Sequence, residues 1–217
     1  MRINRRGFIK AAAAAAAAGA MGWLAACGRD DASTAGGDLR PPRPNGMARG
    51  VFVARGSDPG EMVRAALAAA GGLGALIRSG DVVAVKPNIA WDRSPQTAAN
   101  TSPEVVAAIV RAALEAGAGK VLVFDRTVND PRLTYSRSGV ADAARDAGAA
   151  VVYVDDRDFV EIEIPGGAAM ERWPYYRPAL EADCLINCPV PKHHSTSGLT
   201  MAMKNSMGLL GGRRGTL

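Results

Sequence analysis

The residue types in this chain that are capable of chemistry gather in one stretch, between Asp183 and Gly208. Basic side chains alternate there with hydroxyls and an amide, in the order Lys192, His193, His194, Ser197, Thr200, Lys204 and Asn205. Ammonium, hydroxyl and amide groups all donate hydrogen bonds, so together they suit a carboxylate or a phosphate. A histidine with an ordinary pKa near neutrality can also act as a general acid or base. The pattern predicts an anion site, with His194 and Lys192 as the candidate catalytic residues.

An earlier apolar stretch ends in residues of the same kind. The run from Val82 to Val85 is typical of a strand covered on both faces in a parallel sheet, and Lys86 and Asn88 follow it. A second apolar strand, 184–188, is stopped by prolines. Ligands of open α/β sheets bind beyond the carboxyl ends of the strands, and a helix N-terminus near Ser197 would add N–H groups. The predicted ligand-binding residues are therefore Lys86, Asn88, Ser197, Thr200, Lys204 and Asn205.

Two other interpretations of these residues stay open. In the first, the lysines are simply solvated and the asparagines cap turns. In the second, His193 and His194 bind a metal with Asp125 or Asp183, but adjacent histidines diverge on an extended chain and a catalytic zinc needs three protein ligands. Because no spacing fixes a third ligand, no metal residue is assigned. A serine hydrolase is not favoured, since the sequence contains no Gly-x-Ser-x-Gly elbow.

The elements that would position these residues alternate between strand and helix over residues 50–217. Strands are expected at 51–54, 82–85, 120–124, 151–154, 159–164 and 184–188, and residues 173–177 are expected to form a loop. Helices are expected from Pro59 to about Gly71, from Pro103 to Gly117, and through 142–147. Such alternation predicts one α/β domain with a mainly parallel sheet and helices on both faces. A glycine-rich dinucleotide fingerprint between strand and helix is missing.

The first 27 residues have the pattern of an export signal. Arg5 and Arg6, with Phe8 two positions on, resemble the twin-arginine motif that an export receptor reads. The Ala-rich run behind them is too short and too weakly apolar for the ~20 residues of a membrane span. Leu24-Ala25-Ala26-Cys27 resembles a bacterial lipobox, which would make Cys27 a lipidated residue; ordinary signal-peptidase cleavage is the alternative. Residues 28–49 are polar and rich in Gly and Pro, which predicts a disordered linker.

The net charge of +5 comes mostly from this leader, which holds four cations and no acid. Without those four, 22 Lys and Arg face 21 Asp and Glu, and no basic stripe interleaved with aromatics appears. The composition therefore gives no reason to expect a nucleic-acid partner. Cys184 and Cys188 lie four positions apart on one strand, about 13 Å between Cα atoms, which is too far for a disulfide.

Three ordered motifs resemble the family catalogued as domain of unknown function 362. They are Gly80–Asn88, Ala182–Pro189, and Lys192-x-His194 leading into Met203-Lys204-Asn205-x-x-Gly208. The resemblance extends over residues 51–217 and implies no established activity. It implies 4Fe-4S clusters in some members, but this chain has no cluster motif, so the cofactor is left open. It also implies further strands beyond 217, so the domain at 50–217 is expected to be incomplete at its C-terminus.

Two functions are consistent with these patterns. One is an exported enzyme or redox-associated protein that acts on an anionic small molecule at the Lys/His/Asn site. The other is a lipid-anchored periplasmic protein that binds an anion without turnover. The expected partners are the twin-arginine export machinery, the anionic ligand and, through Cys27, a membrane. The expected location is outside the cytoplasmic membrane.

Overall fold

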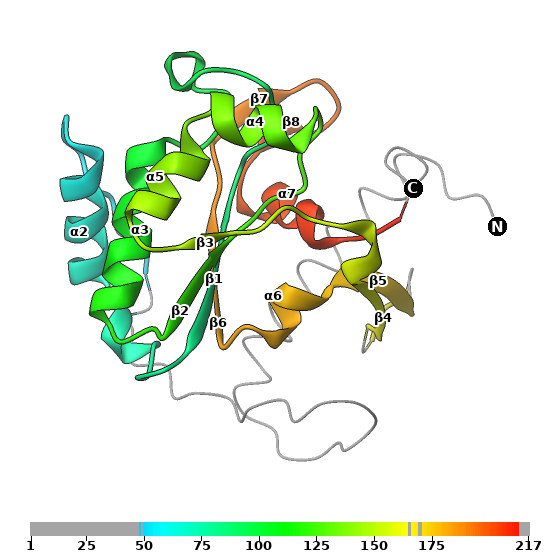
Figure 1. Cartoon of the computed structure of the whole chain (residues 1–217), viewed down its shortest axis with the longest axis horizontal. Coiled ribbons are helices and arrows are strands. Elements are labelled where there is room, and N and C mark those ends of the chain that lie inside the picture. Colours follow the sequence, from blue (N-terminus) through cyan, green and yellow to red (C-terminus); the bar gives the residue numbers. More distant parts are fainter. Residues whose placement is uncertain (1–47, 49, 165, 169–170, 213–217) are drawn as a thin grey trace.

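The computed structural model describes residues 48, 50–164, 166–168 and 171–212 (Figure 1). The predicted leader with its lipidation residue Cys27, and all of the predicted linker except Ala48, lie outside the described residues. Within the described part, no helix has the length and apolar character needed to cross a membrane.

Four parallel strands form the central sheet, which confirms the predicted α/β class. The sheet has the order β3-β2-β1-β6, built from β1 (Val82–Pro87), β2 (Lys120–Val123), β3 (Ala150–Val151) and β6 (Cys184–Cys188). From β1 the chain moves outward to β2 and β3, and it then returns to place β6 on the other side of β1. The strand order therefore reverses between β1 and β6. In open α/β sheets, the crevice at the carboxyl ends of two such strands is the usual ligand site.

One face of the sheet is covered by helices from the first two thirds of the chain (Figure 1). They are α2 (Pro59–Ala69), α3 (Pro103–Glu115), α4 (Pro131–Arg137) and α5 (Val140–Asp146). Proline occupies the start of α2, and Asp58 accepts a hydrogen bond from the Glu61 N–H, as expected for a capped N-terminus. Valines of β1 and β2, such as Val85 and Val123, are fully buried against these helices.

The opposite face packs against later elements. These are the hairpin of β4 (Phe159–Glu163) and β5 (Arg172–Tyr176), helix α6 (Arg177–Glu181), and the pair α7 (Ala202–Asn205) and η5 (Ser206–Leu209). Ala84 and Phe124 supply the core on this side, together with the ring of Tyr176, which contacts Phe124 edge to face. The described residues also form three single turns of 3-10 helix: η2 (Leu73–Ala75), η3 (Pro95–Thr97) and η4 (Asp156–Asp158).

Four sequence-based expectations about elements were wrong. Residues 51–54 form no strand, and Val51 is 92% exposed. The strand expected at 151–154 is confined to β3, and the loop expected at 173–177 is mostly strand β5, because it finds a pairing partner in β4. No helix starts near Ser197. This residue lies instead in the turn of a hairpin formed by β7 (Lys192–His194) and β8 (Gly198–Thr200).

The close approach of two loops at the amino ends of β1 and β2 gives a test of the fold. A Cβ added at Gly119 would lie 2.9 Å from both Cα and the carbonyl oxygen of Gly80, which are backbone atoms that cannot simply rotate away. We expect Gly119→Ala to lower the free energy of unfolding by about 1–3 kcal/mol, measured by urea denaturation. Gly74→Ala is the matched control, because nothing lies within 4 Å of its Cβ position. Equal stabilities of the two variants would contradict the loop packing.

Candidate functional site

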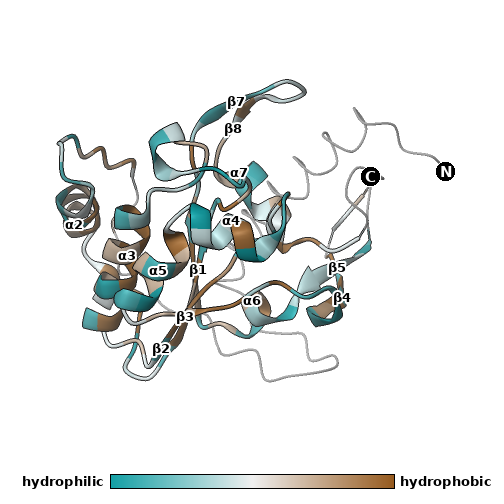
Figure 2. Ribbon diagram, turned by 45° about the horizontal axis from the view of Figure 1, so that its top comes forward, coloured by the Kyte–Doolittle hydropathy of each residue, from teal (hydrophilic) through white to brown (hydrophobic). Residues whose placement is uncertain are grey.

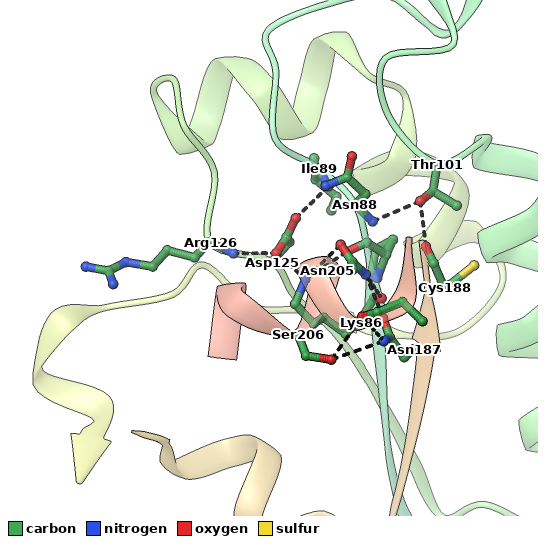
Figure 3. Close-up of polar contacts among 12 residues, drawn as sticks. Lys86, Asn88, Ile89, Thr101, Asp125, Arg126, Asn187, Cys188, Asn205 and Ser206 are labelled. Atoms are coloured by element: carbon green, nitrogen blue, oxygen red, sulfur yellow. Dashed lines mark hydrogen bonds and ion pairs between the residues drawn. The ribbon is translucent and has the colours of Figure 1, made fainter. Parts of the chain in front are cut away.

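A buried ion pair lies at the carboxyl ends of β1 and β2 (Figure 3). The Lys86 Nζ is 2.6 Å from Oδ1 of Asp125, and the two side chains are 1% and 3% exposed. Lys86 also donates to the Pro87 carbonyl, at 3.2 Å. The carboxylate accepts the backbone N–H of Ile89 on Oδ2, at 2.6 Å, and that of Arg126 on Oδ1, at 2.8 Å. Both charges are thus paired and hydrogen bonded, as a buried pair requires.

This arrangement places Lys86 beneath the surface rather than in an open pocket. The Lys86 ammonium forms its ion pair with Asp125. Direct contact between Lys86 and a ligand therefore stays a prediction. Asp125 is the residue that sequence reasoning undervalued, because it appeared only as a possible third metal ligand. Its position directly after the apolar run 120–124 was the available signal.

Asn205 ties α7 to the ends of β1 and β6. Its Oδ1 accepts from Lys86 Nζ at 3.2 Å, and its Nδ2 donates to the Lys86 carbonyl at 3.1 Å and to Asn187 Oδ1 at 2.7 Å. Asn187 in turn donates to the Ala202 carbonyl at 2.8 Å and to the Ser206 hydroxyl at 3.2 Å. Asn205 is 5% exposed, so its amide joins the elements instead of facing a ligand.

Gly208 completes the packing around the ion pair. A Cβ at this position would lie 2.6 Å from Asp125 Oδ1 and 2.8 Å from Lys86 Cε. Asn205 and Gly208 are three positions apart, so both face the pair from the same side of the α7–η5 segment. The Asn-x-x-Gly spacing noted in the sequence therefore places both residues against the ion pair.

Lys192 lies in the same region, in contact with the loop that follows β1. Its Nζ donates to Asn88 Oδ1 at 2.6 Å and to the Ala99 carbonyl at 2.7 Å, so its charge meets only neutral oxygens. Thr101 fixes this loop, because its hydroxyl accepts from the Asn88 N–H at 2.8 Å and donates to the Cys188 carbonyl at 2.7 Å. Thr101 was not predicted as a site residue.

Three basic groups in this region have lowered pKa values, and the charge of Lys204 contributes to the shifts of the other two. Burial lowers the pKa of Lys192, the Asp125 charge opposes that shift, and Lys204 lowers the pKa further. Burial likewise lowers the pKa of Lys204. The pKa of His194 is lowered by burial and then by Lys204, His193 and Lys192. Within the described part of the chain, no group forms a hydrogen bond or an ion pair with the half-buried Lys204 ammonium.

His194 is held in one orientation by its own turn. Its Nδ1 accepts the backbone N–H groups of Thr196 and Ser197, at 3.2 and 3.3 Å. We assign the ring proton to Nε2 on this basis, because the accepting nitrogen must be unprotonated. Together with the lowered pKa, this makes the imidazole neutral at pH 7 and leaves Nε2–H as its free donor.

The two predicted hydroxyl ligands behave differently. Thr200 pairs with Lys192 across the hairpin and is 6% exposed, and its Oγ1 is buried with no hydrogen-bond partner among the described residues. Ser197 is exposed at the turn and donates to the Leu199 carbonyl at 3.2 Å. The structure thus gathers Lys86, Asn88, Thr200, Asn205 and Lys192 around the switch point, and it leaves Ser197 at the hairpin turn.

A metal centre receives no support from the described residues. No group of three or more His, Cys, Asp or Glu side chains among them is placed to hold an ion. Asp125 pairs with Lys86, and Asp183 accepts the Val82 N–H at 2.8 Å, so both proposed third ligands have other partners. Cys184 and Cys188 form no disulfide within the described residues, and burial raises the pKa of Cys188 to about 12.

A cleft of about 920 Å³ opens on the other side of Asp125, beyond the ends of β2 and β3. Arg126 lines this cleft. Its guanidinium lies over the Phe159 ring and forms an ion pair with Asp156. Apart from Asp125, its lining includes no residue considered in the sequence-based site.

The ion pair can be tested by removing one member at a time. We expect Asp125→Ala to destabilise the protein by about 3–5 kcal/mol in urea unfolding, because it leaves the Lys86 charge buried and unpaired. Glu161→Ala is the control: this acid pairs with Arg172 at the surface, and its loss should leave the unfolding midpoint nearly unchanged. Adding Lys86→Met to Asp125→Ala should recover part of the lost stability. If the effects of the two substitutions on the free energy of unfolding were strictly additive, the result would contradict coupling between Lys86 and Asp125.

The leader and the domain both match known protein families. Residues 2–22 match the twin-arginine translocation signal sequence, which indicates export across the cytoplasmic membrane. The Thylakoid-associated protein sll1697 of Synechocystis sp. is 31% identical over 157 residues, which are 70% of this chain. Those residues cover 46% of that relative, so the chain matches less than half of its length. No solved structure matches the chain significantly.

The remaining match covers the elements that build the site. The profile described as Domain of unknown function (DUF362) matches residues 83–216, a span that runs from β1 through the β7–β8 hairpin to Asn205 and Gly208. More than half of the chain therefore carries this domain, including every residue around the Lys86–Asp125 pair. The chain belongs to the DUF362 domain family.

Proposed function

We propose that this exported protein binds an anionic small molecule through Lys192, Lys204 and His194, beside the point where the strand order reverses. The observation that carries the proposal is the half-buried Lys204 ammonium, which has no partner among the described residues and lies near two other basic groups. Desolvation lowers the pKa of all three groups, and like charge lowers it further for Lys192 and His194. A bound anion would remove the repulsion.

Other donors in the region support the same ligand class. The buried Thr200 hydroxyl has no partner in the part of the chain that the structure describes, and an unpaired buried hydroxyl carries a free-energy cost that a ligand oxygen could relieve. The Nε2–H of His194 is free to donate. Ammonium, hydroxyl and imidazole N–H groups together match a carboxylate or phosphate.

Binding has more support in this geometry than proton transfer. His194 was predicted as a general acid or base, but its Nδ1 lone pair is used by two backbone N–H groups. Its lowered pKa also makes the imidazolium form rare at neutral pH. A role for Lys192 as a catalytic base would need its ammonium to leave Asn88 and Ala99. Attachment to a membrane through Cys27 remains part of the proposal, and the name of the thylakoid-associated relative is consistent with it.

Direct binding of anions tests the proposal. We expect inorganic phosphate or succinate to bind in isothermal titration calorimetry, and Lys204→Gln or Lys192→Gln to weaken this binding by about tenfold or more, the loss typical of a charged hydrogen bond. Lys120→Gln is the matched control, because this exposed lysine lies at the opposite, amino end of β2. If Lys120→Gln weakened binding as much as the site variants, general charge attraction would explain the result and the site would be refuted.

The pH dependence of the affinity follows from the lysine pKa values. Because the pKa of Lys204 lies below its ordinary 10.5, the free protein loses this charge at a lower pH than a solvated lysine does. Anion affinity should therefore fall as the pH rises through the lowered pKa, before 10.5 is reached. In Lys204→Arg the charge persists, so the fall should move to higher pH. An affinity that stays constant up to pH 10.5 would contradict the proposed role.

A further inference from the structure

The exposed large apolar side chains of the described residues have an uneven distribution. One group, here called the apolar rim, lies on segments that follow the carboxyl ends of the sheet strands; it comprises Trp91, Val128, Leu133, Tyr153, Leu199, Met201, Met203 and Met207. The others lie together at 51–53. The helices α2, α3, α5 and α6 carry no exposed large apolar side chain, so this is not a general property of the surface.

The β7–β8 hairpin and α7 carry the strongest part of the rim. Leu199 and Met203 are each 58% exposed and Met201 is 48% exposed. Neighbouring residues of a strand face opposite sides, so Leu199 and its partner His193 face outward while Thr200 and Lys192 face the anion site. The hairpin extends beyond the body of the molecule (Figure 2). Exposed apolar patches of this kind mark interaction surfaces.

The segment that carries the hairpin and α7 has charges of one sign. From Cys184 to the last residue the sequence contains no Asp or Glu, whereas Lys192 and Lys204 lie within the hairpin and α7. Apolar side chains on a segment whose only charges are basic fit a surface that presents an apolar layer beneath anionic groups. Trp91 and Tyr153 add rings of the type that favours the boundary between water and lipid.

We propose that the apolar rim docks on the surface of an anionic phospholipid bilayer, with Leu199, Met201 and Met203 entering the headgroup boundary. We assign a bilayer as the binding partner for two reasons. The basic charges of the hairpin segment are complementary to anionic headgroups. The protruding apolar side chains are also separate from one another, so they need no matching groove on a partner. Export by the twin-arginine route brings the protein to the outer side of a membrane. Docking of this kind does not depend on Cys27 or on the ligand of the anion site.

Vesicle co-sedimentation tests the proposal with the full chain. Every sample carries Cys27→Ser, so that no acyl chain contributes, and the leader is the same in all samples. The vesicles contain phosphatidylcholine alone or mixed with phosphatidylglycerol. We expect the parent to prefer the mixed vesicles, and Leu199→Ser/Met203→Ser to bind them about tenfold more weakly, because two apolar side chains are lost. The anion site is left intact in this variant.

Val51→Ser/Val53→Ser is the matched control, since these valines are 92% and 74% exposed outside the rim. This control should bind like the parent, and all variants should share one melting temperature because the changed side chains are exposed. Equal vesicle binding by the rim variant and the parent would overturn the proposal, as would a parent that does not distinguish the two lipid mixtures. A concentration-dependent dimer lost in the rim variant, seen by ultracentrifugation without lipid, would assign the surface to a second copy instead.

Discussion

The buried pair of Lys86 and Asp125 is the constraint on which the described site depends. An ammonium and a carboxylate out of water are tolerable only when every remaining donor and acceptor is satisfied. Here the backbone N–H groups of Ile89 and Arg126 and the amide of Asn205 meet that demand. Because those groups belong to the ends of two strands and to α7, satisfying the pair also fixes how these elements meet.

The parts of the fold that depend on local pattern could be predicted from the sequence. The runs at 82–85, 120–124 and 184–188 are short, continuous and apolar, and all three became strands of the parallel sheet. Elements whose existence depends on a distant partner could not be predicted. Residues 173–177 became strand mainly because β4 offers a pairing edge, and residues 51–54 stayed out of any sheet because no strand pairs with them.

The structure brings most of the candidate residues together, but their division between a buried ion pair and lysines without an acidic partner was hidden, since it depends on contacts far apart in the sequence. Lys86 and Lys192 look alike as lysines near strand ends, yet one is paired with an acid 39 positions away and the other meets only neutral oxygens. The helix expected at Ser197 failed for a local reason. Gly198 adopts a φ of +70°, which suits the turn of a hairpin and interrupts a helix.

The buried Lys86 and the half-buried Lys204 lie in one region but differ in their partners. Lys86 is paired with Asp125, whereas Lys204 has no counterion among the described residues. Asn205 and Gly208 face inward on the α7–η5 segment, where any added atom would strike the ion pair. Lys204, one position from Asn205, lies away from that pair and gains no counterion among the described residues. The same short segment thus packs against the buried ion pair on one side and carries a half-buried cation on the other. A change at Asn205 would therefore disturb the proposed anion site through α7, even though the Asn205 side chain is buried.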